Sequence, residues 1–321
     1  MIHGLVGEAQ DELFGKLMMV DIDSEHQVDP TQVPAIHWDS MVDNPTESRV
    51  GWSFLDDERN KFDVDGQWWL YERMFKEQKL REHFLDRDSP QLQYNDEAVA
   101  TYQRSIKRFQ ELLLCLLHTV SGQPARATEI LGVRWKNTEQ GGVRNIFIED
   151  GLVSLVISYH KGYMNSGNLK IIHRYLPKEI GELLVYYLWL VRPFYEKLQF
   201  QANRKRCNSA FLWGDSKKVD HKQWTGPKKR RNNRRDREGS SGSSSSSSKE
   251  QDIPEMDWSS ERMRKALQSA SLRWMGVKLH IAAWRHIAIA ISRRYCQKNQ
   301  FWVEEQGQDK ANEWEEHEDN P

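Results

Sequence analysis

Gln123-Pro-Ala-Arg-Ala-Thr-Glu-Ile-Leu-Gly-Val-Arg-Trp135 opens the stretch of the chain, residues 121–177, that decides the fold. Proline is tolerated in the first turn of a helix, so this segment predicts a short helix that begins at Pro124. Arg126 then lies in the first turn, and Glu129 follows three residues later on the same face. Such a pair is either an ordinary surface ion pair or a cation held in place for a ligand.

Strand patterns follow this helix. Near alternation and β-branched residues predict strands over residues 144–148, 152–159 and 170–176, with a turn at Asn165-Ser-Gly-Asn168. The segment Tyr159-His-Lys-Gly-Tyr163 places Lys161 at the tip of a hairpin. We therefore predict a three-stranded antiparallel sheet attached to a mainly helical domain.

Helical patterns lie on both sides of this stretch. Apolar residues at three- and four-residue spacing predict a helix from Asp96 onward, and its last turns, residues 112–117, are apolar all round, which implies burial. Further helices are predicted to begin at Asp11, at Pro177, at Ser259 or Ser260, and at Ile281.

These patterns divide the chain into six segments. They are an irregular N-terminal segment (1–66), a helical segment (67–118), two parts of one domain (119–215 and 255–299), a basic and serine-rich insertion predicted to be disordered (216–254), and an acidic tail (300–321).

Charge is strongly segregated along the 321 residues, although the formal net charge is only −1. Residues 1–100 carry 22 acidic against 9 basic side chains, residues 204–237 carry 3 against 13, and residues 304–319 carry 8 against 1. This asymmetry predicts a basic surface for a polyanion, flanked by acidic segments. The three cysteines are too far apart for a disulfide framework and no apolar run could span a bilayer, so we expect a soluble intracellular protein without a membrane partner.

Arg285 lies in an otherwise apolar helix, beside Ile287, Ala288 and Ile291. A guanidinium group is seldom buried without a partner, so we expect Arg285 to be buried and to need an anion from the protein or from a ligand.

Three stretches, taken in their order along the chain, resemble the catalytic domain of the tyrosine recombinases, the phage integrase-like family. The segment 124–135 is similar to the family's first-arginine box, and Lys170-Ile-Ile-His-Arg-Tyr-Leu-Pro177 is similar to the end of its lysine-bearing hairpin. Trp284-Arg-His286 resembles the second-arginine helix. The residues of these stretches most resemble the fungal branch of the family, namely the Crypton-like recombinases and the segments beside RecQ-type helicases in subtelomeric genes. The resemblance covers about residues 67–298.

In that family a tyrosine attacks a DNA phosphodiester, arginines clamp the non-bridging oxygens, and a lysine protonates the departing 5′-oxygen without a metal or cofactor. The resemblance implies that Arg126, Lys161 and Arg285 converge as catalytic residues, supported by Glu129 and His286. It implies double-stranded DNA as the partner, with homo-oligomers on DNA, and no small-molecule ligand. Basic side chains assigned to DNA contacts are Arg134, Lys170, Arg174, Lys228, Lys229, Arg230 and Arg231.

The chain departs from the family pattern at two places. Ala282 stands where the family has His, Lys or Tyr, and His280 could substitute only with a shifted backbone. No tyrosine follows Glu304 in the window of the nucleophile, and Tyr295 is expected to be a packing residue. The nucleophilic tyrosine is therefore absent, as in a C-terminally truncated recombinase.

These observations predict a nuclear DNA-binding protein of tyrosine-recombinase type, related to DNA integration and recombination by mobile elements, and catalytically silent. The basic run Lys228–Arg237 is either a nuclear localisation signal or a solubilising charge run. Two alternatives stay open for the whole chain: a non-catalytic accessory or interaction module of a helicase-linked subtelomeric protein, and an active strand-exchange enzyme whose gene model is truncated.

Overall fold

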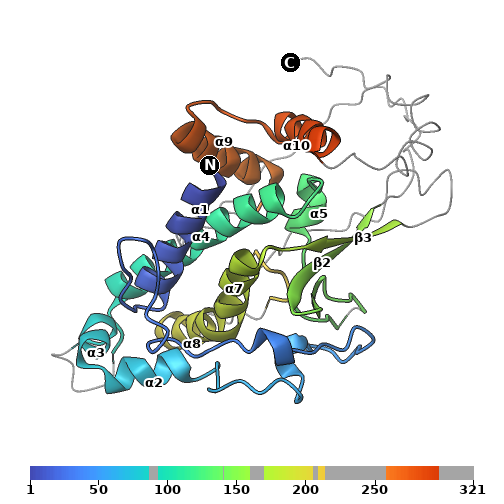
Figure 1. Ribbon diagram of the computed structural model, residues 1–321. Helices are drawn as coiled ribbons and strands as arrows, with labels where there is room; N and C mark the ends of the chain where they lie inside the picture. The colour runs from blue at the N-terminus through green and yellow to red at the C-terminus, as the bar shows by residue number, and fades with distance from the viewer. Residues whose placement is uncertain (87–92, 140, 160–169, 205–208, 214–257, 296–321) are drawn as a thin grey trace, which may run out of the picture.

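The structure is a computed structural model that describes residues 1–86, 93–139, 141–159, 170–204, 209–213 and 258–295. It is mainly helical with one small antiparallel sheet, as the sequence predicts (Figure 1). The elements are α1 (Ile2–Gln10), α2 (Trp69–Lys76), α3 (Gln78–Phe84), α4 (Asp96–Val120), α5 (Ala127–Leu131), β1 (Ile146–Glu149), β2 (Leu152–Tyr159), β3 (Lys170–Tyr175), α7 (Lys178–Tyr186), α8 (Arg192–Asn203), α9 (Ser260–Met275) and α10 (Ile281–Tyr295).

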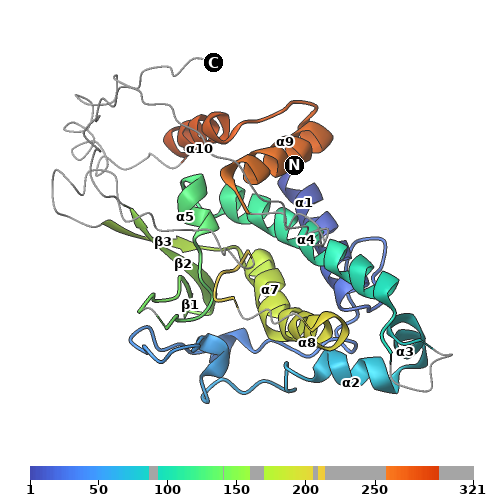
Figure 2. The ribbon, with the colours of Figure 1, turned by 180° about the vertical axis from the view of Figure 1, so that it is seen from behind.

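Helix α4 is the centre of the molecule. Its first turn is capped by Asn95, whose side chain accepts hydrogen bonds from the amides of Glu97 and Ala98. Every residue from Leu112 to Leu117 is at most 3 % exposed, as their apolar run predicts. Helices α1, α3, α7, α8 and α9 pack against α4, and Figures 1 and 2 show it running between them.

The sheet has the order β1-β2-β3, with Ile146 opposite Leu155 and Tyr159 opposite Lys170. The predicted bounds of the second strand are confirmed, but the first strand begins at Ile146 rather than at residue 144. The backbone amides of residues 144 and 145 are used elsewhere, since that of Arg144 donates to Oδ1 of Asn137 and that of Asn145 to the carbonyl oxygen of Arg134. The central strand β2 packs against α5 and α7.

The short helix begins at Ala127, not at Pro124 as predicted. Arg126 has extended backbone angles and is the residue before the first turn, and its amide donates to the Glu129 carboxylate at 2.9 Å. This reach-back hydrogen bond of a third-position glutamate is one half of a capping box and defines where the helix begins. The predicted helix at Pro177 is confirmed one residue later, and a π-helical segment, Tyr187–Val191, joins α7 to α8.

Residues 1–66 share one apolar core with the later helices. The predicted helix from Asp11 is a π-helical segment, Asp11–Leu17, that continues from α1. Leu5, Leu13 and Leu17 are at most 1 % exposed and belong to the same cluster as α4. Glu8 of α1 accepts hydrogen bonds from Arg273 and Trp274 of α9.

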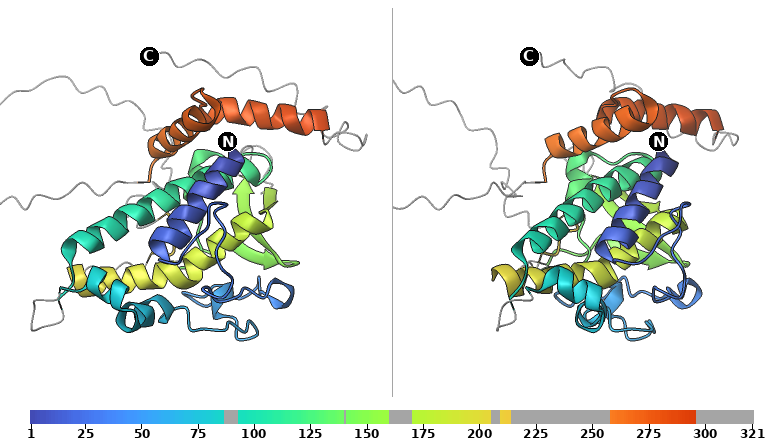
Figure 3. Two further views of the ribbon diagram at one scale, coloured as in Figure 1. Left: turned by 60° about the vertical axis from the view of Figure 1, so that its left-hand side comes forward. Right: turned by 90° about the vertical axis from the view of Figure 1, so that its left-hand side faces the viewer.

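Helices α9 and α10 cover one end of the molecule, next to the N-terminus (Figure 3). The helix α9 begins where predicted, with Ser259 as its cap through the amide of Arg262, and its residues Met263 and Leu267 are buried. In α10 only Trp284 is buried. The predicted insertion 216–254 and acidic tail 300–321 lie outside the described residues.

Candidate functional site

The strand β3 contributes a buried arginine. Arg174 is 5 % exposed, and its Nη1 donates a hydrogen bond to the carbonyl oxygen of Gln123, three residues before Arg126. Burial lowers the pKa of Arg174, and the negative charge of Glu129 opposes that shift. The segment that carries half-buried Arg126 is therefore tied to Arg174 by a backbone contact and by charge.

The end of α4 contributes a buried histidine that the sequence did not single out. His118 is 1 % exposed, and its pKa is lowered to about 4 by burial and by the positive charges of Arg174 and Arg285. The charges of one arginine of β3 and one of α10 therefore both act on the imidazole at the end of α4. Figures 1 and 2 show α10, α5 and this end of α4 together.

Buried polar atoms around this histidine have unused hydrogen-bonding capacity. Within the described residues, neither ring nitrogen of His118 has a partner, and neither has Nε of Arg174. Buried polar groups are nearly always hydrogen-bonded, so we expect each of these three nitrogen atoms to bind a water molecule or an anion. The concentration of positive charge favours the anion.

The electrostatics favour an anion for a second reason. Arg174 is buried, and the positive charge of exposed Arg285 acts on the same neutral imidazole. Glu129 offsets part of this charge through Arg174. A phosphate would offset the rest, and guanidinium groups bind phosphate oxygens with strong, charge-assisted hydrogen bonds.

Arg285 does not have the environment that its apolar neighbours predict. It is exposed, and so are His286 and Ile291, because α10 buries only a narrow stripe around Trp284. The prediction of a buried Arg285 is wrong. An exposed guanidinium beside a buried cation is nevertheless accessible to a ligand from solvent.

The other predicted site residues are not gathered at His118. Arg134 is half-buried, with its guanidinium 5.4 Å from the Phe211 ring, and its Nη1 lies 3.4 Å from the carbonyl oxygen of Val143. His280 precedes α10, and its Nδ1 lies 3.0 Å from Nε2 of Gln268. Lys170 pairs with Tyr159 through the backbone of β3. Lys161, Lys228, Lys229, Arg230 and Arg231 lie outside the described residues.

Tyr295, the last residue of α10, is 70 % exposed. The expectation that it packs in the interior is wrong, since this end of α10 contacts solvent. Ten residues of helix separate it from Arg285, which is about 15 Å along the axis.

We expect His118 to make the folded state sensitive to acid. Its pKa is about 4 when folded and near 6.5 when unfolded, so the unfolded chain binds the proton more tightly. Stability from this residue is therefore complete above about pH 6.5, falls as the pH drops, and is lost by about pH 4, with a total near 3 kcal/mol.

Urea unfolding at neutral pH and at about pH 4.5 measures this effect. Between the two pH values, the free energy of unfolding of His118→Leu should fall by about 2 kcal/mol less than that of the unmodified chain. His286→Gln, a change at an exposed histidine of α10, should keep the original difference. An equal pH dependence in the His118 variant would contradict the assignment.

Searches with this chain find no matching protein-family model and no matching solved structure. Among the described residues, no helix combines the length and the apolar character needed to cross a bilayer. The same part of the chain contains no group of three or more His, Cys, Asp or Glu side chains placed to hold a metal ion.

Proposed function

We propose that this chain is a DNA-binding protein of tyrosine-recombinase type, and that the site around His118 receives a phosphate of duplex DNA. One observation carries the proposal: Arg174 and Arg285 both act on a buried imidazole that has no hydrogen-bond partner in the described residues. We include Arg126 as a third cation of the site because Gln123, three residues before it, accepts a hydrogen bond from Arg174.

The order of the three motifs supports the same reading. The first-arginine box, the hairpin and the second-arginine helix resemble those of the recombinases, and Arg126 and Arg285 come from the first and last of them. The small sheet beside a helical core is compatible with the integrase-like catalytic fold, which we propose for residues 67–298. The basic run 228–237 would add non-specific attraction to DNA and suits a nuclear protein.

We further propose that this site binds DNA without cleaving it. Tyr295 is the tyrosine of α10, and its distance of about 15 Å along the helix from Arg285 is too large for both to act on one phosphate. Arginines that clamp a phosphate contribute to binding whether or not a nucleophile is present, because the interaction is electrostatic.

Titration of a labelled duplex at several salt concentrations tests the proposal. If half-buried Arg126 and exposed Arg285 contact phosphates, the logarithm of the binding constant should fall with the logarithm of salt concentration with a slope of about −2 or steeper. The same samples, denatured after incubation with a nicked suicide substrate, should contain no covalent protein–DNA adduct. Absence of duplex binding at low salt would refute DNA binding, and an adduct would refute the silent site.

A further inference from the structure

A hollow of about 510 Å³ lies in the N-terminal segment, within residues 43–59. This segment runs beneath the sheet and α8, at the end of the molecule opposite α10 (Figures 1 and 2). Its lining contains five carboxylates and two guanidinium groups. The excess of negative charge excludes a phosphate and makes the hollow unlike the site around His118.

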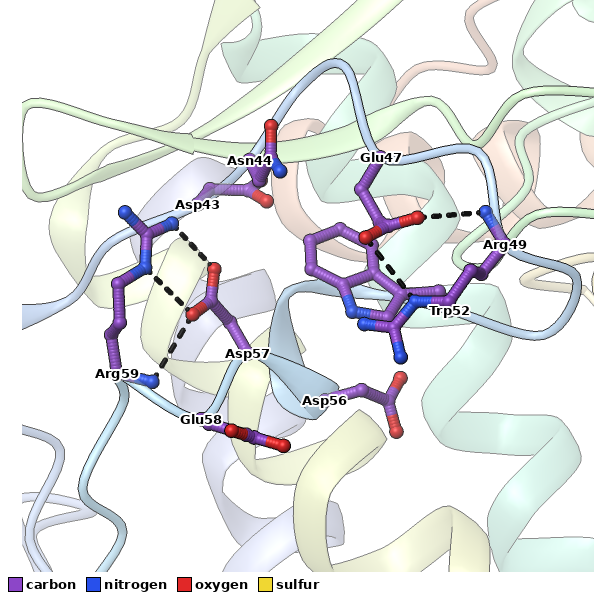
Figure 4. A pocket seen from close by; sticks show the side chains of 9 residues that line it. All are labelled: Asp43, Asn44, Glu47, Arg49, Trp52, Asp56, Asp57, Glu58 and Arg59. Atoms are coloured by element: carbon purple, nitrogen blue, oxygen red, sulfur yellow. Dashed lines mark hydrogen bonds and ion pairs between the residues drawn. The ribbon is translucent and has the colours of Figure 1, made fainter.

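Most of these charged groups are already paired. Asp57 binds Arg59 through two contacts of 2.8 and 2.6 Å, and Glu47 lies 3.2 Å from Nε of Arg49 (Figure 4). A third carboxylate, Asp43, is buried against Arg144. Two other carboxylates of the lining remain outside these ion pairs, and they give the hollow its negative charge.

Those two carboxylates are Asp56 and Glu58. Asp56 uses Oδ2 to accept hydrogen bonds from the amide and hydroxyl of Ser53, at 2.8 and 2.9 Å. Its Oδ1, and both oxygens of exposed Glu58, have no hydrogen bond or ion pair within the described residues. The charge of Asp56 also acts on Lys136, so Glu58 and the remaining oxygen of Asp56 are the groups of this wall that suit a cationic ligand.

A buried donor gives the ligand a second requirement. Trp52 is 5 % exposed and lines the hollow, and its indole Nε1 has no partner in the described part of the chain. In Figure 4 the nitrogen-bearing edge of this indole is turned toward the space between Asp57 and Asp56. The ligand should therefore carry a hydrogen-bond acceptor as well as a positive charge.

A second hollow, of about 460 Å³, shares Asp56 with the first. Its lining includes Trp135 and Phe200, and Phe200 is 39 % exposed. The ammonium groups of its two lysines lie over tryptophan rings, Lys136 at 4.8 Å and Lys197 at 4.1 Å. The lining also contains Asp56 and Glu196, and its apolar part, formed by Trp135, Pro193 and Phe200, suits an apolar side chain.

We infer that the two hollows, which share Asp56 in their linings, bind a peptide segment of a partner protein that carries basic residues next to apolar ones. A lysine or arginine would lie against Asp56 and Glu58, a backbone carbonyl would accept from Trp52, and an apolar side chain would contact Phe200. The three requirements of charge, acceptor and apolar surface are met together by such a peptide.

Fluorescence anisotropy with a labelled peptide, two arginines followed by two leucines in a glycine–serine background, tests this inference. The double change Asp56→Asn with Glu58→Gln removes both charges and keeps an amide oxygen as the cap acceptor, so affinity should fall at least tenfold. Trp52→Phe keeps the ring and removes the donor, and should weaken binding about fivefold. Phe200→Ala should also weaken binding.

Matched controls separate this surface from net charge and from the DNA site. Glu25→Gln with Asp39→Asn changes the total charge equally at exposed acids outside the hollows and should keep full peptide affinity. The Asp56–Glu58 variant should bind duplex DNA as the unmodified chain does. A peptide of this chain's own residues 228–237, which contain no apolar side chain, should bind at least tenfold more weakly than the probe.

Three results would each overturn the inference. They are no measurable binding of the probe at millimolar concentration, equal binding by the Asp56–Glu58 variant when its unfolding curve is unchanged, and binding of the 228–237 peptide as tight as that of the probe.

Discussion

Arg144→Ala should lower the free energy of unfolding by about 3–5 kcal/mol, because it leaves a buried carboxylate without its counter-charge. The Arg144 side chain is 0 % exposed and that of Asp43 is 2 % exposed. The two groups form a pair of parallel hydrogen bonds, both of 2.8 Å. The guanidinium also lies 4.6 Å from the Trp52 ring and 4.1 Å from the Phe147 ring.

The position of this pair explains the size of the effect. Arg144 also donates to the carbonyl oxygens of Asn44 and Ile146, and Asp43 accepts from the amide of Ile148. One ion pair thus attaches the N-terminal segment to β1. A change that removes one of the two charges leaves the other charge desolvated and unpaired. This costs more free energy than the intact pair contributes.

Chemical denaturation of variants measures this prediction. Lys76→Ala, at an exposed ion pair with Glu72, should change stability by less than about 0.5 kcal/mol. The double variant Arg144→Met with Asp43→Leu should lose less than Arg144→Ala alone, since it removes both charges and keeps apolar volume. A loss under about 1 kcal/mol for Arg144→Ala would show that the pair does not hold the segment.

Arg285→Ala should weaken duplex binding about tenfold and make the salt slope shallower by about 1, the loss expected for one phosphate contact. Arg285 is exposed, so its removal should leave the unfolding curve unchanged. The variant therefore isolates binding from folding, which a change at buried Arg174 would not do.

A control and a second readout accompany this prediction. Arg104→Ala removes the same charge from an exposed position on α4, about 21 Å along the helix from His118, and should keep the original slope. Nuclear magnetic resonance should show a higher pKa of His118 in Arg285→Ala, since one cation that opposes its protonation is gone. Equal slopes in the two variants, or an unchanged His118 titration, would contradict the proposed site.

The sequence predicted much of the local structure because local patterns dominate there. The spacing of apolar residues in α4, the alternation in β2 and the cap at Ser259 are short-range features, and all are confirmed. The start of α5 was misplaced because Pro124 is compatible with a first turn, while the Glu129 carboxylate, bound to the Arg126 amide, begins the helix later.

The local sequence patterns do not predict which single charged residues are buried. Arg285 has apolar neighbours in sequence but is exposed, whereas Arg174 and Arg144 lie in ordinary strand patterns and are buried. Which face of a helix or strand meets the core depends on elements far away along the chain. A polar residue that directly follows the apolar run 112–117 was the available signal for His118.

By itself, the sequence determined the helical class, the three-stranded sheet and the order of the arginine-bearing segments, because periodicity and turn residues act over a few positions. Only the tertiary structure decided that residues 1–66 share the core, that the charges of Arg174 and Arg285 both lower the pKa of His118, and that an acidic hollow forms around Trp52. Each of these depends on contacts between residues tens to hundreds of positions apart, and long-range packing sets their burial and charge environment.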